Sequence, residues 1–158
     1  MFKKIKIAHK NSKPLLVRNA ITLKTFRLDF DFDMMFGLLA QHNYLGHSLK
    51  KEFVGQIVQV NNIPIFKTYV NYISTHLKNL FNIGDLDFFY SLKGEIGPAH
   101  KDDENVIILG IKNITYYHIN NIDLQINPGD VLFVPKNVLH HSFSSRERIV
   151  LSVSLWEK

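Results

Sequence analysis

Two short stretches in the second half of the chain decide the fold. The first is Gly97-Pro98-Ala99-His100-Lys101-Asp102, which places a histidine and an aspartate two positions apart. The second is Pro128-Gly129-Asp130-Val131-Leu132-Phe133-Val134-Pro135, which ends five residues before His140. Imidazole and carboxylate groups are common ligands of divalent metal ions. Because the sequence between the two stretches has the pattern of short strands, we expect a metal site inside a small β-barrel.

The chain after residue 84 alternates apolar and polar residues with period two, the pattern of half-buried strands. Seven strands are predicted there, at residues 87–92, 106–111, 114–119, 122–126, 131–134, 138–143 and 148–156. Many short strands separated by turn residues predict a barrel or a sandwich. The predicted fold class is therefore mainly β, with a jelly-roll barrel formed by residues 85–158.

Residues 1–84 are expected to cover the outside of this barrel within one domain, residues 1–158. Alternation predicts strands at residues 2–8, 15–17, 26–32 and 53–60, and Asp33 is expected to cap a short helix over residues 34–41. Pro64 begins the one main amphipathic helix, which is expected to end near residue 82. Its apolar side chains recur at spacings of three and four, at Phe66, Val70, Ile73, Leu77 and Leu80.

The composition limits both the class of protein and the kind of site. Hydrophobic residues are 46% and charged residues 21% of the 158 residues, values typical of a globular protein. Cysteine is absent, so any metal must use histidine and carboxylate ligands. The formal charge of +5 is spread along the chain and does not favour a nucleic-acid partner. No apolar run approaches the roughly 20 residues of a membrane helix, so we expect a soluble cytoplasmic protein.

The metal ligands are predicted from strand geometry and from the barrel. Residues two apart on a strand point to the same face, so His100 and Asp102 can reach one ion. A jelly-roll would add His140, because strands distant in sequence lie side by side in it. Two imidazoles and one carboxylate leave three coordination positions open, as in non-haem Fe(II) oxygenases. Asp103 and His141 stay as alternatives to their neighbours, although each would point to the opposite face.

These stretches resemble the JmjC-like and cupin-like 2-oxoglutarate/Fe(II) oxygenases, whose fold is a double-stranded β-helix. Residues 13–20 (KPLLVRNA) are similar to the opening of these domains, and residues 97–102 to their metal-binding His-x-Asp motif. Residues 128–135 are similar to their Pro-Gly-Asp strand, and residues 153–156 to their final strand. The resemblance implies Fe(II), 2-oxoglutarate and O2. Conversion of 2-oxoglutarate to succinate and CO2 would then be coupled to substrate oxidation, usually hydroxylation.

The resemblance also implies a cation inside the barrel for the far carboxylate of 2-oxoglutarate. Lys112, in Gly110-Ile111-Lys112, is similar to the family's strand lysine, although its spacing from Asp102 is shorter than usual. Arg148, eight residues after His140 on the last predicted strand, is the alternative, and the choice stays open. The residues expected to donate hydrogen bonds or to line the cavity are Asn105, Thr115, Tyr117, Ser154 and Tyr90.

Two further functions stay open at this point. The first is a non-catalytic cupin that binds a metal or a small molecule, and the second is a cupin enzyme that does not use 2-oxoglutarate. Cupins outside the 2-oxoglutarate oxygenases usually carry more histidines around the first metal motif, so the His-x-Asp pair favours the oxygenase. The primary substrate stays open between a small molecule and a protein side chain, and the oligomeric state is not predicted.

Overall fold

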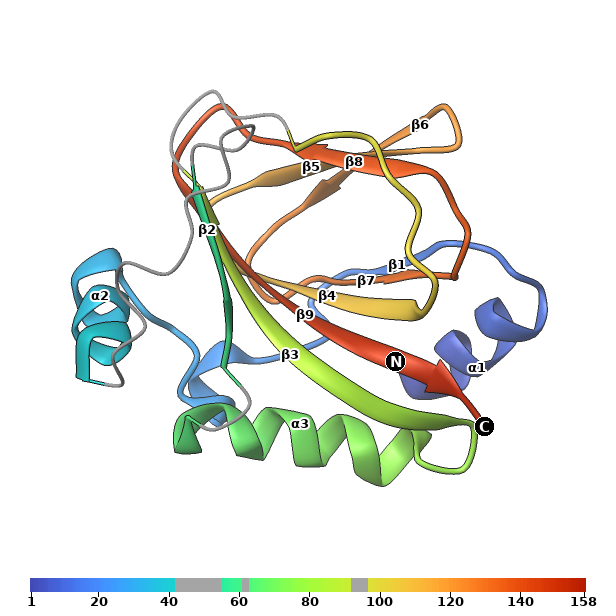
Figure 1. The fold of residues 1–158 in the computed structure, drawn as a ribbon, viewed down its shortest axis with the longest axis horizontal. Helices are drawn as coiled ribbons and strands as arrows, with labels where there is room; N and C mark the ends of the chain where they lie inside the picture. Colours follow the sequence, from blue (N-terminus) through green and yellow to red (C-terminus); the bar gives the residue numbers. More distant parts are fainter. Residues whose placement is uncertain (42–54, 61–62, 92–96) are drawn as a thin grey trace.

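The computed structural model describes residues 1–41, 55–60, 63–91 and 97–158. Their strands form two antiparallel sheets that face each other across the interior (Figure 1). In order across the larger sheet lie β1 (Leu15–Val17), β7 (Val131–Val134), β4 (Asn105–Lys112), β9 (Arg148–Glu157), β3 (Phe81–Ser91) and β2 (Gly55–Gln59). The smaller sheet contains β6 (Ile122–Ile126), β5 (Thr115–Ile119) and β8 (His140–Phe143). The mainly β prediction is confirmed.

The chain crosses between the two sheets repeatedly after β4, as in a jelly-roll. It passes from β4 to the smaller sheet for β5 and β6, returns for β7, crosses again for β8 and ends in β9. Asn120 and Asn121, with φ angles of 47° and 66°, form the two-residue turn that joins β5 to β6. Asparagine tolerates this left-handed backbone, which matches the twist of a hairpin. Strand pairs distant in sequence, such as β4 with β9, are therefore neighbours in space.

Both faces of the larger sheet are buried. Alternate residues of its central strands belong to two different hydrophobic clusters, one under the helices and one between the sheets. Ile107 and Leu109 of β4 join the core beneath the helices, whereas Val106 and Ile108 face the smaller sheet. Strand β9 divides in the same way. Burial on both faces explains why β4 is a nearly continuous apolar run. This division leaves one face of β4 and β9 to line the interior.

Three described α-helices lie outside the barrel: α1 (Phe2–Lys10), α2 (Phe32–Gln41) and α3 (Pro64–Leu77). The prediction of the amphipathic helix at Pro64 is confirmed, with Phe66, Ile73 and Leu77 fully buried. Its predicted end near residue 82 was too late, because Phe81 already begins β3. None of the helices in the described ranges combines the length and the apolar character needed to span a bilayer.

Two predicted N-terminal strands were wrong. Residues 2–8 lie in α1, where Phe2, Ile5 and Ala8 are buried at a spacing of three, a helical periodicity that the alternation of lysine and isoleucine masked. Residues 26–32 are not a strand either: a 3₁₀ helix, η1 (Leu23–Phe26), ends at Arg27 in a left-handed conformation. Leu28 and Phe30 are buried as the alternation indicated, but the segment has no strand partner among the described residues.

The other N-terminal predictions are closer to the structure. Strand β1 has the predicted bounds, and β2 lies within the predicted residues 53–60, of which 53 and 54 are outside the described ranges. Helix α2 begins two residues before the predicted start. Its cap is Asp31 rather than Asp33, because the Asp31 Oδ1 accepts a hydrogen bond from the Met34 amide at 2.8 Å.

A buried carboxylate ties the N-terminal segment to the barrel. Asp130, in the Pro-Gly-Asp turn before β7, accepts hydrogen bonds from the Arg18 Nη1 at 2.7 Å, the Asn19 amide at 2.8 Å and the Asn127 amide at 3.0 Å. The neighbouring Gly129 carbonyl accepts from the Ile21 amide at 3.0 Å. Burial alone would raise the pKa of Asp130, but these hydrogen bonds outweigh it and lower the pKa. The turn therefore holds residues 18–21 against the barrel.

We expect Asp130→Asn to lower the free energy of unfolding by about 3 kcal/mol, because the neutral amide cannot satisfy the donors that surround the carboxylate. Urea unfolding followed by circular dichroism would measure this. A group with a lowered folded-state pKa stabilises fully above its unfolded pKa, and that contribution disappears as the pH falls through the folded-state value. The advantage of the wild type over Asp130→Asn should therefore shrink in acid.

The matched control is Asp123→Asn, whose carboxylate is 73% exposed and ion-paired to His118. Exposed pairs of this kind contribute about 0–1 kcal/mol, so this variant should unfold close to the wild-type midpoint. Equal losses in the two variants, or a wild-type advantage that persists undiminished in acid, would contradict the role given to Asp130.

Candidate metal centre

A backbone bridge brings the two predicted histidine ligands together. The His100 amide donates to the His140 carbonyl at 2.9 Å, and the His140 amide donates to the His100 carbonyl at 3.0 Å. The ring centroids of the two histidines are 4.4 Å apart. The Asn137 amide also donates to the Asp102 carbonyl at 2.8 Å, which holds the turn before β8 against the segment before β4. The pairing of these two segments thus positions all three side chains.

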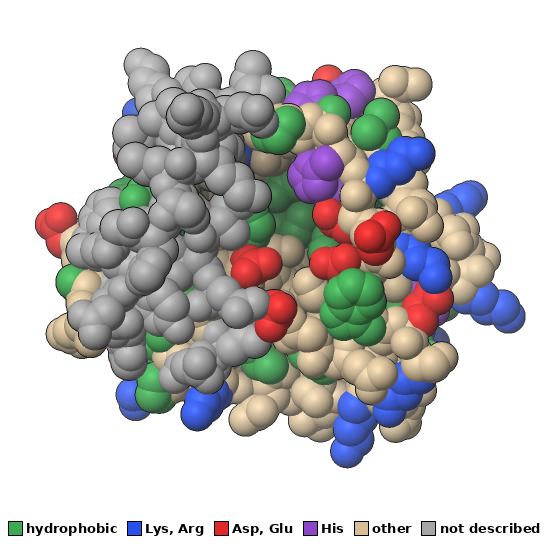
Figure 2. All heavy atoms as spheres, in the orientation of Figure 1, with side chains coloured by type: hydrophobic (Ala, Val, Ile, Leu, Met, Phe, Trp, Pro, Cys, Tyr) green, Lys and Arg blue, Asp and Glu red, His purple; other side chains and the backbone are tan. Residues whose placement is uncertain are grey.

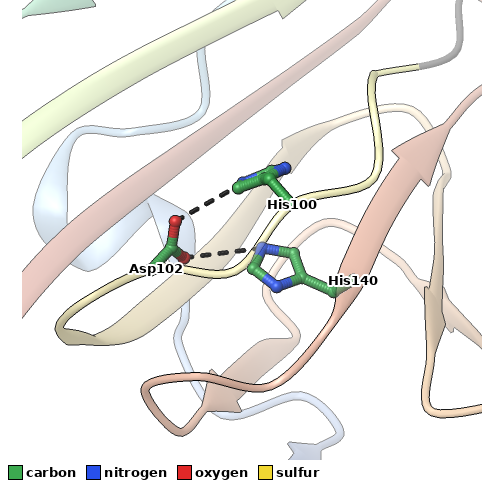
Figure 3. Close-up of side chains that lie close together, drawn as sticks. All are labelled: His100, Asp102 and His140. Carbon is green, nitrogen blue, oxygen red and sulfur yellow. Dashed lines mark ion pairs between the residues drawn. The ribbon is translucent and has the colours of Figure 1, made fainter.

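The side chains of His100, Asp102 and His140 converge on one point (Figure 3). The His100 Nε2 lies 3.4 Å from the Asp102 Oδ1, and the His140 Nε2 lies 3.5 Å from the Asp102 Oδ2. One ligand atom from each residue lies within 4.8 Å of the others. Two nitrogens and a carboxylate oxygen at this separation can share one ion. That an ion binds here stays a prediction.

Hydrogen bonds fix the orientation of both imidazole rings. The His100 Nδ1 lies 2.9 Å from the Pro98 carbonyl, and the His140 Nδ1 lies 2.9 Å from the Val138 carbonyl. A carbonyl oxygen can only accept, so each Nδ1 carries a proton, and in the neutral form of either ring the lone pair is on Nε2. Both Nε2 atoms face Asp102. Metal-binding histidines are commonly oriented in this way by a carbonyl on the other nitrogen.

The environment of His140 favours its neutral form. Its side chain is buried on the floor of the site, and this burial lowers the pKa of His140, although the Val138 carbonyl and the Asp102 carboxylate oppose the shift. A histidine must be neutral to bind a metal ion. His100, by contrast, is exposed at the rim. The group therefore has one buried and one exposed imidazole.

The three residues line a cavity of about 520 Å³ between the two sheets. The space-filling view shows a hollow on this face, with histidine and acidic side chains around it (Figure 2). Apolar side chains of β3, β4 and β9, namely Phe89, Val106, Ile108 and Val150, form much of its wall. A cavity of this size and composition is suited to a small ligand.

Arg148 lies in the same cavity and is the buried cation of the site. Its side chain is almost inaccessible to solvent, the Nε donates to the Ser91 Oγ at 2.7 Å, and the Nη2 donates to the Ser142 Oγ at 2.9 Å. Ser142 stands opposite Tyr117 in the pairing of β5 with β8. Burial raises the pKa of Tyr117, whereas the Arg148 charge opposes this shift and the Asp102 charge adds to it. The pKa of Tyr117 therefore depends on the charges of both Arg148 and Asp102.

Only some of the other predicted site residues line the cavity. Ser154 and Tyr117 line the cavity, whereas Asn105, Lys112, Thr115 and Tyr90 are not among its described lining residues. The Asn105 side chain instead donates from Nδ2 to the Leu155 carbonyl and accepts at Oδ1 from the Lys136 backbone amide. Tyr90 packs against the core on the helix side of the larger sheet. The structure thus brings Arg148, rather than Lys112, into the cavity that holds the histidines.

The two alternative ligands lie outside the group. Asp103 is exposed and does not belong to the cluster of potential ligands. His141 points to the outer face of the smaller sheet, where its ring stacks on that of His118 with a centroid distance of 5.1 Å. The alternation of side chains along β8 accounts for the separation of His141 from His140.

Sequence reasoning missed Ser142 and Glu104, which line this cavity, and Ser91, which binds the Arg148 side chain. Ser142 is two residues after His140 on the same strand, so the period of two could have placed it on the cavity face. Ser91 contacts Arg148 only because β3 pairs with β9, a pairing that no local signal announces. Glu104 lines the cavity and accepts from the Ser154 hydroxyl at 3.0 Å.

Comparison with solved structures identifies the fold. A prolyl-4-hydroxylase from Pseudomonas putida is 10% identical, with a TM-score of 0.70 and full coverage of both chains. The Escherichia coli ribosomal oxygenase YcfD is 16% identical, with a TM-score of 0.70, over 100% of this chain and 53% of that chain. A YcfD complex with cobalt and succinic acid is 13% identical, with a TM-score of 0.59, over 92% of this chain and 48% of that one.

A cupin superfamily protein from Desulfitobacterium hafniense is also similar, with 13% identity and a TM-score of 0.50 over 70% of this chain and 84% of that chain. The chain spans about half the length of the YcfD structures. No protein-family model and no curated protein matches the sequence. At these identities the likeness concerns the fold: the chain has the jelly-roll barrel that these oxygenase and cupin structures share.

Proposed function

We propose that this chain is an oxygenase that uses Fe(II) and 2-oxoglutarate to oxidise a C–H bond of its substrate, usually by hydroxylation. One observation carries the proposal: a His–Asp–His group and a buried arginine line the same cavity of a jelly-roll barrel. A metal site alone would suit many cupins. A buried guanidinium in the same cavity adds a partner for a cosubstrate carboxylate.

The donor set fits Fe(II). His100 and His140 offer imidazole nitrogens and Asp102 offers a carboxylate oxygen, the ligands typical of non-haem Fe(II) sites with open positions. The chain contains no cysteine that would favour softer ions. The complex of the YcfD structure with cobalt and succinic acid supports a divalent ion and a dicarboxylic acid in this fold. His140 would be the buried anchor, and His100 the ligand nearer to solvent.

Arg148 fits the far carboxylate of 2-oxoglutarate. Arginine binds carboxylates through two parallel hydrogen bonds, and burial strengthens such bonds because water competes less. Ser91 and Ser142 hold the guanidinium in place, so little side-chain entropy remains to be lost when an anion binds. Tyr117, between the two ends of the cavity, would orient the bound molecule through its hydroxyl group.

Bound Fe(II) would supply the activation of O2, with two electrons from the decarboxylation of 2-oxoglutarate to succinate and two from the substrate. The protein supplies geometry and a dry environment. Val106, Ile108 and Val150 would exclude water from the cosubstrate, and Asp102 would offset part of the metal charge.

We expect anaerobic addition of Fe(II) and 2-oxoglutarate to give a metal-to-ligand charge-transfer band, because the cosubstrate chelates the metal through its 2-oxo and carboxylate groups. Asp102→Ala and His140→Ala should abolish the band. Loss of an outer partner of a metal ligand costs about 10–100-fold in affinity, and loss of a ligand itself should cost more. Absorption spectroscopy in a sealed cell would measure the titration.

Asp103→Ala and His141→Ala are the matched controls, because each changes the same residue type one position away, outside the converging group. Both should keep the band. A wild-type protein without the band would refute the use of 2-oxoglutarate, and a band that survives Asp102→Ala but not Asp103→Ala would move the metal to the alternative ligand.

We expect Arg148→Lys to weaken 2-oxoglutarate binding by about 30-fold or more, because lysine cannot form the paired hydrogen bonds and a disrupted buried charge contact costs about 2 kcal/mol or more. Lys112→Met should leave the affinity close to that of the wild type. Titrating the charge-transfer band with 2-oxoglutarate would give both constants. Iron binding without 2-oxoglutarate, measured separately, should be retained in both variants. A larger loss in Lys112→Met than in Arg148→Lys would make the lysine the anchor.

The alternative function is a cupin that binds a metal or a small molecule without 2-oxoglutarate. The likeness to the D. hafniense cupin, with a TM-score of 0.50, is compatible with it. It predicts tight metal binding with no charge-transfer band and no succinate formation. The titration described above therefore distinguishes the two functions.

A further inference from the structure

The positive charge of the chain is concentrated at its N-terminal end. Residues 1–28 hold eight of the 19 Lys and Arg residues and none of the 14 Asp and Glu residues. Residues 29–158 therefore carry a net charge of −3, although the whole chain carries +5. The expectation that the charge is spread along the chain was therefore wrong. A segment with charges of one sign is a candidate contact surface for a partner of the opposite sign.

Helix α1 presents lysines on the side that faces away from the core. Its other side is buried in the core beneath the helices. Lys3, Lys6 and Lys10 are exposed and recur at spacings of three and four residues, so they form one row along the helix. This lysine row is about 10 Å long, because a helix rises about 1.5 Å per residue. Lys4 is exposed on the same helix, and Lys13 just after the turn that follows it.

The lysine row forms no ion pair with a carboxylate in the part of the chain that the structure describes. Between described residues, the ion pairs of Lys and Arg side chains are those of Arg18 with Asp130 and of Lys136 with Glu157. The Lys136 ammonium lowers the pKa of Glu157, and His9 of α1 makes a smaller contribution. This carboxylate is thus already paired, and the charge of the row is available to a partner.

The lysine row does not stabilise the helix that carries it. Lys3 and Lys4 stand in the first turn, which contains no acidic residue, at the positive end of the helix dipole. Lys3 with Lys6, and Lys6 with Lys10, are like-charge pairs at spacings that destabilise a helix. Only Lys10, in the last turn, is favourably placed for the dipole. Neutral residues would give a more stable helix, so folding does not account for these charges.

Aromatic contacts near both ends of α1 fix the helix to the rest of the protein. Phe2 stacks on His76 of α3 with 4.4 Å between ring centroids, and its edge-to-face contact with Tyr72 has a centroid distance of 5.1 Å. Near the other end, the His9 ring packs against Phe81 of β3 at 4.6 Å. Because the helix is already ordered, its backbone has little freedom to lose when the lysines bind a partner.

We propose that the lysine row binds the phosphate backbone of a double-stranded nucleic acid. Successive phosphates of one strand are about 3.4 Å apart along the axis of a duplex, so the row spans about three of them. The exposed side chains of α1 are lysines and Ile7, with no exposed aromatic ring on which a base of a single strand could stack. Lysine contacts with phosphates carry no sequence information, so the binding does not depend on sequence.

A lipid surface fits this helix less well than a duplex. Interfacial helices bury their apolar side in the membrane, whereas the apolar side of α1 already belongs to the core. Ile7, which is 55% exposed, is the large apolar side chain that remains on its surface. Because residues 29–158 are acidic overall, a polyanion would approach from the side of α1. In Figure 2, Lys and Arg side chains lie mostly on the side where Figure 1 shows α1.

We expect fluorescein-labelled duplexes of about 20 base pairs, one of DNA and one of RNA, to bind the protein with an affinity that falls as salt is added. Replacing Lys3, Lys6 and Lys10 together by Gln should weaken this binding by about tenfold or more at roughly 0.1 M salt. It should also reduce the slope of log affinity against log salt by about three, since each phosphate contact contributes about 0.9. Fluorescence anisotropy would measure both quantities.

The matched control replaces Lys67, Lys112 and Arg146 by Gln, which removes the same charge from residues outside α1. Its affinity should stay within about threefold of the wild type, with an unchanged salt slope. Circular dichroism should show the α1 variant unfolding at or above the wild-type temperature, because its like-charge pairs are gone. A less stable α1 variant would give the row a structural role and contradict the proposal.

The titration needs neither iron nor 2-oxoglutarate, so its result is independent of the proposed function. Salt-dependent binding of either duplex that is lost in the α1 variant alone would support the proposal. Binding of neither duplex, or equal losses in the two triple variants, would overturn it. Vesicles of phosphatidylcholine with phosphatidylserine test the lipid surface, and tighter binding to them than to both duplexes would also overturn it.

Discussion

The site depends on two backbone hydrogen bonds, those that join His100 to His140. The loop with His100 leads into β4 of the larger sheet, whereas His140 begins β8 of the smaller sheet, and these bonds join the two at one end of the barrel. Because each of these two residues both donates and accepts, the register of the two segments is fixed. The convergence of His100, Asp102 and His140 follows from that register.

Strand β9 contributes the buried cation and two hydroxyl groups of the cavity. Its cavity-facing side chains are a buried arginine, an apolar residue and two serines. Its outward side chains, Leu151 and Val153 among them, belong to the core beneath the helices. One strand therefore joins the core with one face and brings the arginine into the cavity with the other.

The barrel, His100 and Asp102 could be predicted because period-two alternation and the His-x-Asp spacing are local signals. His140 was predicted from the expected jelly-roll, in which strands distant in sequence are neighbours. It did not distinguish Lys112 from Arg148, because that choice depends on which strand faces the interior, a matter of pairing across the sheet. It also misassigned residues 2–8, where lysines at alternate positions imitate a strand, although the apolar residues follow helical spacing. Nonlocal pairing and ambiguous short patterns account for these errors.

The contact between Asp130 and residues 18–21 also bears on how the barrel avoids association. Strand β1 pairs with β7, which would otherwise be the edge of the larger sheet. A bare edge strand with four buried apolar residues is a template for pairing with another chain. The ion pair between the half-exposed Arg18 and the buried Asp130 holds β1 in place at its end, so a single carboxylate in a turn protects a sheet edge several residues away. Residues 15–21 therefore protect the larger sheet from pairing with another chain, in addition to packing against the barrel.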